Sequence, residues 1–264
     1  DPPARLHADG HAWQRREIYK HDAFAATALY ARQDAPEHLA VAKFARLQPA
    51  FGVPFRWLGR WFHQREQRVY RRLAGTPGVP ALLGPITVDH QPWPHAALRR
   101  YVPGRPLTLR DRPPDHYFPQ LQALIGTFHQ QRVAVVDLNK IDNLLIDPHG
   151  NPHLIDFQIS LAPAQHPPIL RGLDPRAWLL PACRRADRYH LMKHWVRRRP
   201  DQLTPDQLDL DQYRPHTVRL WRKLIRPLHL ARRKLFVALQ IRTGRGDPDT
   251  EIAPDARPPL SPDA

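Results

Sequence analysis

Apolar and polar positions alternate in the first part of the chain and then change to a helical spacing. Residues 13–47 contain three runs of β-forming residues, EIYKHD, ATALYARQ and HLAVAKFARL, with the turn-forming DAPE before the third. Such a pattern predicts strands separated by turns. After Pro54, apolar residues from Trp57 to Leu73 recur at helical spacing until Gly75. This second pattern predicts an amphipathic helix.

Two short β-like runs follow that helix and lead to a break in the chain. The runs VPALLGPITVDH and HAALRRYV lie on either side of QPWP, and PGRPL interrupts the pattern at residues 103–107. Residues Tyr117 to Gln131 have the spacing of another amphipathic helix. The order predicts a strand-rich first half, a joint near Pro103 and a mainly helical second half.

The last part of the chain is basic and then Pro- and Asp-rich. The sequence predicts basic helices at residues 187–199 and 216–243, and the second is broken or kinked at Pro227. From residue 246 onward the composition is of low complexity, which predicts disorder.

Charge is the strongest feature of the composition. The 264 residues include 40 Lys plus Arg against 25 Asp plus Glu, a formal net charge of +15. This excess favours anionic partners such as nucleotides, phosphorylated lipids or nucleic acids, without choosing among them. The single cysteine, Cys183, excludes an internal disulfide framework and a cysteine-rich zinc site, and makes a reducing cytosolic compartment the default expectation. The apolar runs are too short to span a bilayer.

Three polar residues interrupt apolar runs within VAVVDLNKIDNLLIDPHGNPHLIDFQIS, residues 133–160. VAVVDL and NLLID are apolar enough to be buried strands, and HGNP predicts a tight turn before a further strand, HLIDF. We expect Asp137, Asn143 and Asp156 to lie on neighbouring chain ends. Their oxygen atoms suit Mg²⁺, which usually completes its shell with nucleotide phosphates. Either these residues form a metal–nucleotide site, or they only satisfy backbone donors in turns.

This segment resembles the catalytic region of the protein-kinase-like superfamily, in which Asp-Leu leads through a short spacer to Asn, and a hairpin leads to Asp-Phe-Gly. The corresponding stretches here are DLNKIDN and DFQ. The resemblance implies that Asp137 is the catalytic base or orients the substrate, and that Asn143 and Asp156 hold Mg²⁺. Lys140 either contacts the transferred γ-phosphate or is a solvated loop lysine.

The motifs depart from the usual pattern at three places. Val135-Val136 replaces the usual His-Arg, the Asp-to-Asn spacing is one residue longer, and Gln158 replaces the glycine. At these positions the sequence resembles the lipopolysaccharide kinase branch of the superfamily, which comprises the Kdo and heptose kinases and their small bacterial relatives. The resemblance covers roughly residues 15–200.

Kinases also place a lysine on a strand to pair the nucleotide phosphates and orient it with a glutamate from the next helix. LAVAKFAR offers Lys43, and Glu66 lies on the predicted helix that follows. Only 6 of the 40 basic residues are Lys and only 4 of the 25 acidic residues are Glu, so these types at these two places favour the resemblance. The alternative is a solvated strand lysine and a surface helix glutamate.

Other positions match the superfamily less well. Residues 21–27, HDAFAAT, contain no glycine where a glycine-rich loop would cover the phosphates, so either the loop works without glycine or nucleotide binding is weakened. The adenine is expected at the backbone of residues 98–102. Asp187 either braces the catalytic loop or is an ordinary acid at a helix start. The spacing of His190 and His194 indicates a pair of surface histidines rather than a metal site.

The resemblance implies an α+β, two-lobed protein-kinase-like fold. Residues 13–102 would form a small, strand-rich N-lobe, residues 103–245 a mainly helical C-lobe, and residues 246–264 a disordered tail. The implied function is an ATP- and Mg²⁺-dependent phosphotransferase acting on a hydroxyl of a lipopolysaccharide-core sugar or similar glycolipid. It would be cytoplasmic or peripheral at the inner membrane, with residues 214–245 on an anionic surface.

Three other functions are consistent with parts of the sequence. A protein serine/threonine kinase is the first, although no Ala-Pro-Glu element follows Asp156. A catalytically inactive kinase-like scaffold is the second, favoured by the glycine-free loop and the missing His-Arg. A nucleic-acid-binding protein is the third, which the net charge alone supports, because no recognition motif is present.

Overall fold

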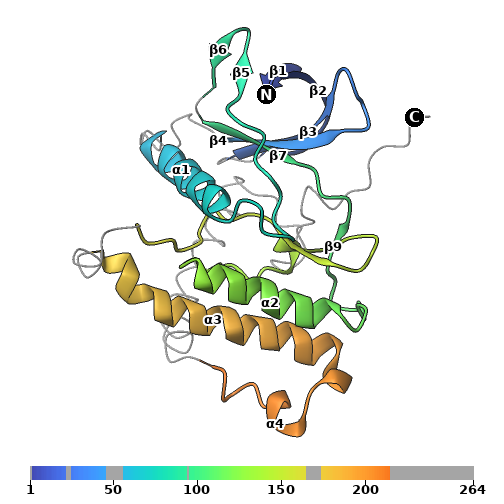
Figure 1. Cartoon of the computed structure of the whole chain (residues 1–264), viewed down its shortest axis with the longest axis vertical. Coiled ribbons are helices and arrows are strands. Elements are labelled where there is room, and N and C mark those ends of the chain that lie inside the picture. Colours follow the sequence, from blue (N-terminus) through green and yellow to red (C-terminus); the bar gives the residue numbers. More distant parts are fainter. Residues whose placement is uncertain (1, 22–24, 46–55, 94, 165–173, 215–264) are drawn as a thin grey trace, which may run out of the picture. The chain divides into compact units, whose positions relative to one another are not determined.

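The computed structural model describes residues 2–21, 25–45, 56–93, 95–164 and 174–214 (Figure 1). The predictions for the centre of the glycine-free loop, for the basic helix 216–243 with its break at Pro227, and for the tail lie outside the described residues.

The chain divides into two compact units. Among the described residues, one unit contains those up to Pro106 together with Leu145–Ser160, and the other contains Leu107–Leu144 and those from Leu161 to Arg214. The first unit is rich in strands and the second is mainly helical. The predicted α+β organisation, with a strand-rich first part and a mainly helical second part, is confirmed. The lobe bounds near residue 103 and at residue 245 remain predictions.

A seven-stranded antiparallel sheet dominates the first unit, in the order β6-β5-β1-β2-β3-β4-β7 (Figure 1). Its strands are β1 Arg5–Ala8, β2 His11–His21, β3 Ala25–Arg32, β4 Leu39–Ala45, β5 Thr87–Val88, β6 Gln91–Pro92 and β7 Ala96–Arg100. The strands predicted within residues 13–47 are confirmed. Alternate residues of β3 pack into different apolar clusters, Ala28 and Tyr30 in one and Leu29 in another. The centre of this sheet is therefore buried on both faces.

A second, three-stranded sheet has the order β10-β9-β8. Its strands are β8 Arg105–Pro106, β9 Leu144–Ile146 and β10 Pro152–Leu154. The predicted hairpin around HGNP is confirmed. Gly104 lies where the chain passes Ile146 so closely that a Cβ would stand 2.7 Å from the Ile146 carbonyl oxygen, and only glycine fits there without a shift.

The predicted helices near residues 57–73 and 117–131 are confirmed as α1 Arg56–Arg72 and α2 Tyr117–Gln130. Gly75, with a φ of +78°, follows the end of α1 in the left-handed region that favours glycine. The second unit also contains η1 Ile141–Asn143, α3 Pro175–Arg198, η3 Pro200–Gln202 and the short α4 Pro205–Leu208.

The helix predicted to begin at residue 187 begins instead at Pro175. Asp174 precedes it, and its carboxylate accepts a hydrogen bond from the Arg176 backbone N–H, so Asp174 caps the helix with proline at the first position. Pro181 lies inside the helix. Asp187 therefore lies in the middle of α3, not at its start.

VAVVDL does not form the predicted strand. Apart from one isolated bridge between Ala134 and Leu161, the segment is irregular. The backbone of Val136 has a φ of +67°, which is incompatible with a continuous strand. Its N–H and that of Val135 donate to the Asp187 carboxylate rather than to a neighbouring strand.

Candidate functional site

A half-buried lysine lies between two carboxylates in the first unit. Lys43 Nζ on β4 is 3.1 Å from Glu66 Oε2 on α1 and 3.1 Å from Asp156 Oδ1, which follows β10. The side chains of Lys43, Glu66 and Asp156 are 18%, 7% and 31% exposed. The structure therefore brings together three residues that separate motifs of the sequence predicted, and the alternative surface positions of Lys43 and Glu66 are wrong.

The electrostatics of this cluster keep Lys43 charged. Burial opposes the ammonium form, but the Asp156 and Glu66 carboxylates outweigh it and raise the pKa of Lys43 above its ordinary value. Burial raises the pKa of Glu66, Lys43 opposes that change, and Asp156 adds to it. With both acids ionised the cluster carries one more negative than positive charge, so a further cation would relieve the repulsion between the carboxylates.

Asp156 is held in an unusual backbone conformation. Its φ is +65°, a left-handed value that non-glycine residues adopt infrequently. Its N–H donates to the Tyr70 hydroxyl of α1 at 3.4 Å, and its Oδ1 accepts from the Gln158 N–H at 3.2 Å. Phe157 is fully buried and meets the Tyr70 ring edge-on, with ring centroids 5.0 Å apart. These contacts fix the carboxylate relative to α1, and no motif in the sequence indicated that Tyr70 belongs to the site.

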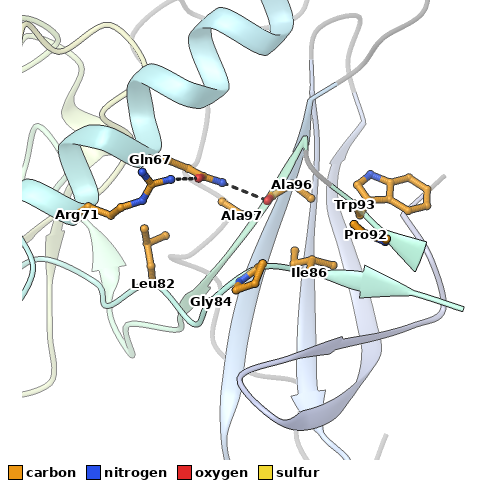
Figure 2. A pocket seen from close by; sticks show the side chains of 10 residues that line it. Gln67, Arg71, Leu82, Gly84, Ile86, Pro92, Trp93, Ala96 and Ala97 are labelled. Carbon is orange, nitrogen blue, oxygen red and sulfur yellow. Dashed lines mark hydrogen bonds between the residues drawn. The ribbon is translucent and has the colours of Figure 1, made fainter. Parts of the chain in front are cut away.

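A pocket of about 450 Å³ lies beside α1 (Figure 2). Gln67 and Arg71 form its wall on α1, and the remaining lining residues are Leu82, Gly84, Pro85, Ile86, Pro92, Trp93, Ala96 and Ala97. Figure 2 shows Arg71 donating to Gln67 Oε1 at 2.6 Å and Gln67 Nε2 donating to the Ala96 carbonyl at 3.4 Å. Because Gln67 follows Glu66, these bonds tie α1 to β7 beside the carboxylate that holds Lys43.

His63 adds to this link one turn earlier on α1. Its Nε2 lies 2.7 Å from Gln67 Nε2. Burial, followed by the charges of His95, Lys43 and Arg71, lowers the pKa of His63 to about 4. The ring is therefore neutral at neutral pH and can accept the Gln67 hydrogen bond.

The second unit holds Asp137 in a tight loop. Asn143 Nδ2, in η1, donates to Asp137 Oδ2 at 3.3 Å, and the Lys140 N–H donates to the Asp137 carbonyl at 3.0 Å. The side chains of Asp137 and Lys140 are half-buried, whereas Asn143 is buried. The three residues predicted within DLNKIDN therefore lie in two consecutive turns, from Asp137 to Lys140 and from Lys140 to Asn143.

Asp187 braces the residues that precede Asp137. This carboxylate is fully buried and accepts hydrogen bonds from the N–H groups of Val135 at 2.8 Å and Val136 at 2.9 Å. His129 Nε2, at the end of α2, lies 3.0 Å from the same carboxylate. Because Val136 is a β-branched residue at positive φ, the loop needs such support to hold this conformation. His129 had no recognisable signal in the sequence.

The donor atoms fit Mg²⁺ better than a softer metal. Asp156 offers carboxylate oxygen, and the amide nitrogen of Asn143 is directed to Asp137, so the amide oxygen is the atom of Asn143 that suits a cation. Among the described residues, no group of three His, Cys, Asp or Glu side chains could hold a metal alone. Asn143 and Asp156 belong to different units, and their joint role as metal ligands remains a prediction.

None of the helices in the described part of the chain is both long and apolar enough to cross a membrane.

Comparisons with known proteins give similarities in structure only. No protein-family model and no curated protein matches the chain. The crystal structure of the Rio2 kinase–ADP/Mg²⁺–phosphoaspartate complex from Chaetomium thermophilum matches 74% of this chain at 16% identity, with a TM-score of 0.49. The CAK complex from the same organism, bound to ATP-γ-S, matches 58% at 21% identity, with a TM-score of 0.42. The matches cover 62% and 48% of those chains, less than two thirds of either.

Proposed function

We propose that the chain is an ATP- and Mg²⁺-dependent phosphotransferase. The half-buried Lys43 cation between Glu66 and Asp156 is the observation that carries this proposal. A strand lysine held by a helix glutamate pairs nucleotide phosphates in kinases, and the aspartate of the Asp-Phe element holds Mg²⁺ there. Perturbed pKa values and residues in sparsely populated φ/ψ regions both cluster at functional sites, and this cluster has both.

In this proposal the chain supplies each group that the transfer requires. Lys43 binds the nucleotide phosphates, with Glu66 keeping its ammonium group in place. Asn143 and Asp156 are the proposed ligands of Mg²⁺, which when bound neutralises the charge that develops on the phosphates. Lys140 is proposed to contact the γ-phosphate.

Asp137 is proposed to orient the acceptor hydroxyl. As the acceptor oxygen bonds to the γ-phosphorus, the bond from that phosphorus to the β,γ-bridging oxygen breaks and ADP leaves. The hydroxyl proton passes to the Asp137 carboxylate. Asn143 Nδ2 donates to Oδ2 of this carboxylate, which restricts its rotation and directs the remaining lone pairs.

We propose a lipopolysaccharide-core sugar or a similar anionic glycolipid as the acceptor. The DLNKIDN loop, the lack of an Ala-Pro-Glu element and the net charge of +15 support this choice over a peptide. The protein would then act in the cytoplasm or at the inner membrane, with the basic segment 214–245 as the surface contact. Apart from Arg214, that segment lies outside the described residues.

The acceptor is tested in three parallel reactions with labelled ATP and Mg²⁺. Two contain an acceptor, either lipopolysaccharide with a truncated core or a mixture of Ser/Thr peptides, and the third contains buffer alone as a control. We expect label on the core sugar, and none on the peptides. Label on peptides and not on lipopolysaccharide would contradict the glycolipid proposal and select a protein kinase.

A catalytically inactive scaffold is the second candidate function. The glycine-free segment HDAFAAT and the Val135-Val136 replacement favour it. The intact Lys43, Glu66 and Asp156 cluster opposes it. The two candidates differ in one result, because a scaffold would produce no ADP even if it binds nucleotide.

A further inference from the structure

The residue that follows Asp137 is anchored to α3 by a histidine. His194 Nε2 lies 2.9 Å from the carbonyl oxygen of Leu138. His194 is only 3% exposed, so the predicted surface position of this histidine is wrong. A carbonyl oxygen can only accept a hydrogen bond, and therefore Nε2 must carry the proton.

A buried arginine one turn later fixes this proton. Arg198 Nη1 lies 3.2 Å from His194 Nδ1, and Arg198 Nε donates to the Thr108 carbonyl at 2.7 Å. Since a guanidinium only donates, Nδ1 of His194 must be the acceptor. Burial and the adjacent Arg198 charge lower the pKa of His194 to about 3. The ring is therefore neutral at neutral pH, with its proton on the nitrogen that faces Leu138.

The two anchors on α3 enclose Asp137. Asp187 accepts from the N–H groups of Val135 and Val136, before Asp137, and His194 lies against the carbonyl of Leu138, after it. Asp187 and His194 are separated by about two turns of α3 and thus lie on one face of that helix. The backbone on both sides of Asp137 is tied to the same rigid element.

We infer that His194 is a positioning residue for Asp137, with Arg198 holding its ring in the tautomer that donates to Leu138. The catalytic consequence rests on the proposed function, whereas the anchoring itself does not. A histidine that only filled space would tolerate any residue of similar volume. A histidine that positions the loop requires a donor at Nε2.

Two substitutions at residue 194 separate these roles. His194→Gln can donate from its amide nitrogen to Leu138 and accept from Arg198 through its amide oxygen. His194→Phe keeps an aromatic ring of similar size and has neither group. Arg198→Met removes the group that fixes the tautomer, and Arg197→Met is its matched control, because Arg197 is the exposed neighbour on the same helix.

Backbone hydrogen exchange of residues 134–143 tests the anchor in the full chain without requiring activity. We expect exchange in this segment to become at least about tenfold faster in His194→Phe, to stay near native in His194→Gln, and to rise in Arg198→Met but not in Arg197→Met. Equal exchange in the native, Gln and Phe forms would overturn the inference. If His194→Phe does not fold, nitrogen NMR of His194 in the native chain tests the inference instead. A proton on Nδ1 rather than on Nε2 would overturn it.

Kinetics then test the consequence for the proposed reaction. We expect kcat to fall about tenfold to a hundredfold in His194→Phe, with KM for ATP changed by less than about twofold, and His194→Gln to restore most of kcat. A fall in kcat equal in the Phe and Gln forms would contradict the positioning role. Absence of transfer in the native chain would contradict the proposed function, and hydrogen exchange would still decide the anchor.

Discussion

Asp137→Ala is expected to lower the rate of phosphate transfer by about 10³-fold and to leave nucleotide binding unchanged. A positioned carboxylate that accepts the proton of the attacking group typically contributes 10²- to 10⁴-fold to a rate. The loop around Asp137 is anchored through its neighbours, Val136 and Leu138, so removal of the carboxylate should leave the backbone in place. The measurement is ADP production with the accepted substrate, alongside nucleotide-induced stabilisation.

Asp206→Ala is the matched control for this variant. Asp206 is an exposed acid in α4 of the same unit and should not affect the rate. Full activity of Asp137→Ala would contradict its assignment as the catalytic carboxylate. A parallel loss of nucleotide-induced stabilisation would instead indicate a collapsed loop.

Lys43→Met is expected to reduce both activity and stability. Transfer should fall by about 10²-fold or more, because the cation proposed to bind the phosphates is gone. The free energy of unfolding should fall by about 3 kcal/mol at pH 7, because the buried Glu66 loses the partner that compensates its charge. Rates of ADP formation and urea unfolding measure the two effects.

The stability loss in Lys43→Met should depend on pH. Burial and Asp156 raise the pKa of Glu66, and Lys43 opposes them, so its removal raises this pKa further. A group whose pKa is raised in the folded state stabilises the fold most below its unfolded pKa and loses that contribution as pH rises through the folded value. The deficit should therefore be smaller at pH 5 than at pH 7.

Two further variants make this result specific to the ion pair. Glu66→Gln combined with Lys43→Met should recover part of the stability at pH 7, because the buried charge is removed. Arg16→Met, an exposed basic residue of β2 in the same unit, should have little effect. A pH-independent deficit in Lys43→Met, unrelieved by Glu66→Gln, would contradict the electrostatic account.

Short-range patterns were sufficient to predict much of the fold. Alternating apolar residues predicted β3 and β4, and helical spacing predicted α1 and α2, because each element buries one face against its own neighbours. The turn chemistry of HGNP predicted the hairpin between β9 and β10. The scarcity of Lys and Glu in this chain drew attention to Lys43 and Glu66, which the structure places in contact.

Long-range contacts caused the failures. VAVVDL has the composition of a strand, but the Asp187 carboxylate, some fifty residues later, binds its N–H groups instead of a strand partner. The start of α3 was missed because Pro181 lies within the helix. His194 was assigned to the surface because its burial depends on Arg198 and Leu138, and no local pattern reports such packing.

The most direct test of the account is unfolding of the native chain with and without ATP and Mg²⁺, compared with Asp156→Asn. We expect ATP plus Mg²⁺ at about a hundred times its Kd to add roughly 2.7 kcal/mol to the native free energy of unfolding. ATP with EDTA should add much less to the free energy of unfolding. In Asp156→Asn, the part of the stabilisation that depends on Mg²⁺ should be lost. No stabilisation of the native chain, or equal stabilisation of Asp156→Asn, would contradict a metal–nucleotide site at Lys43 and Asp156.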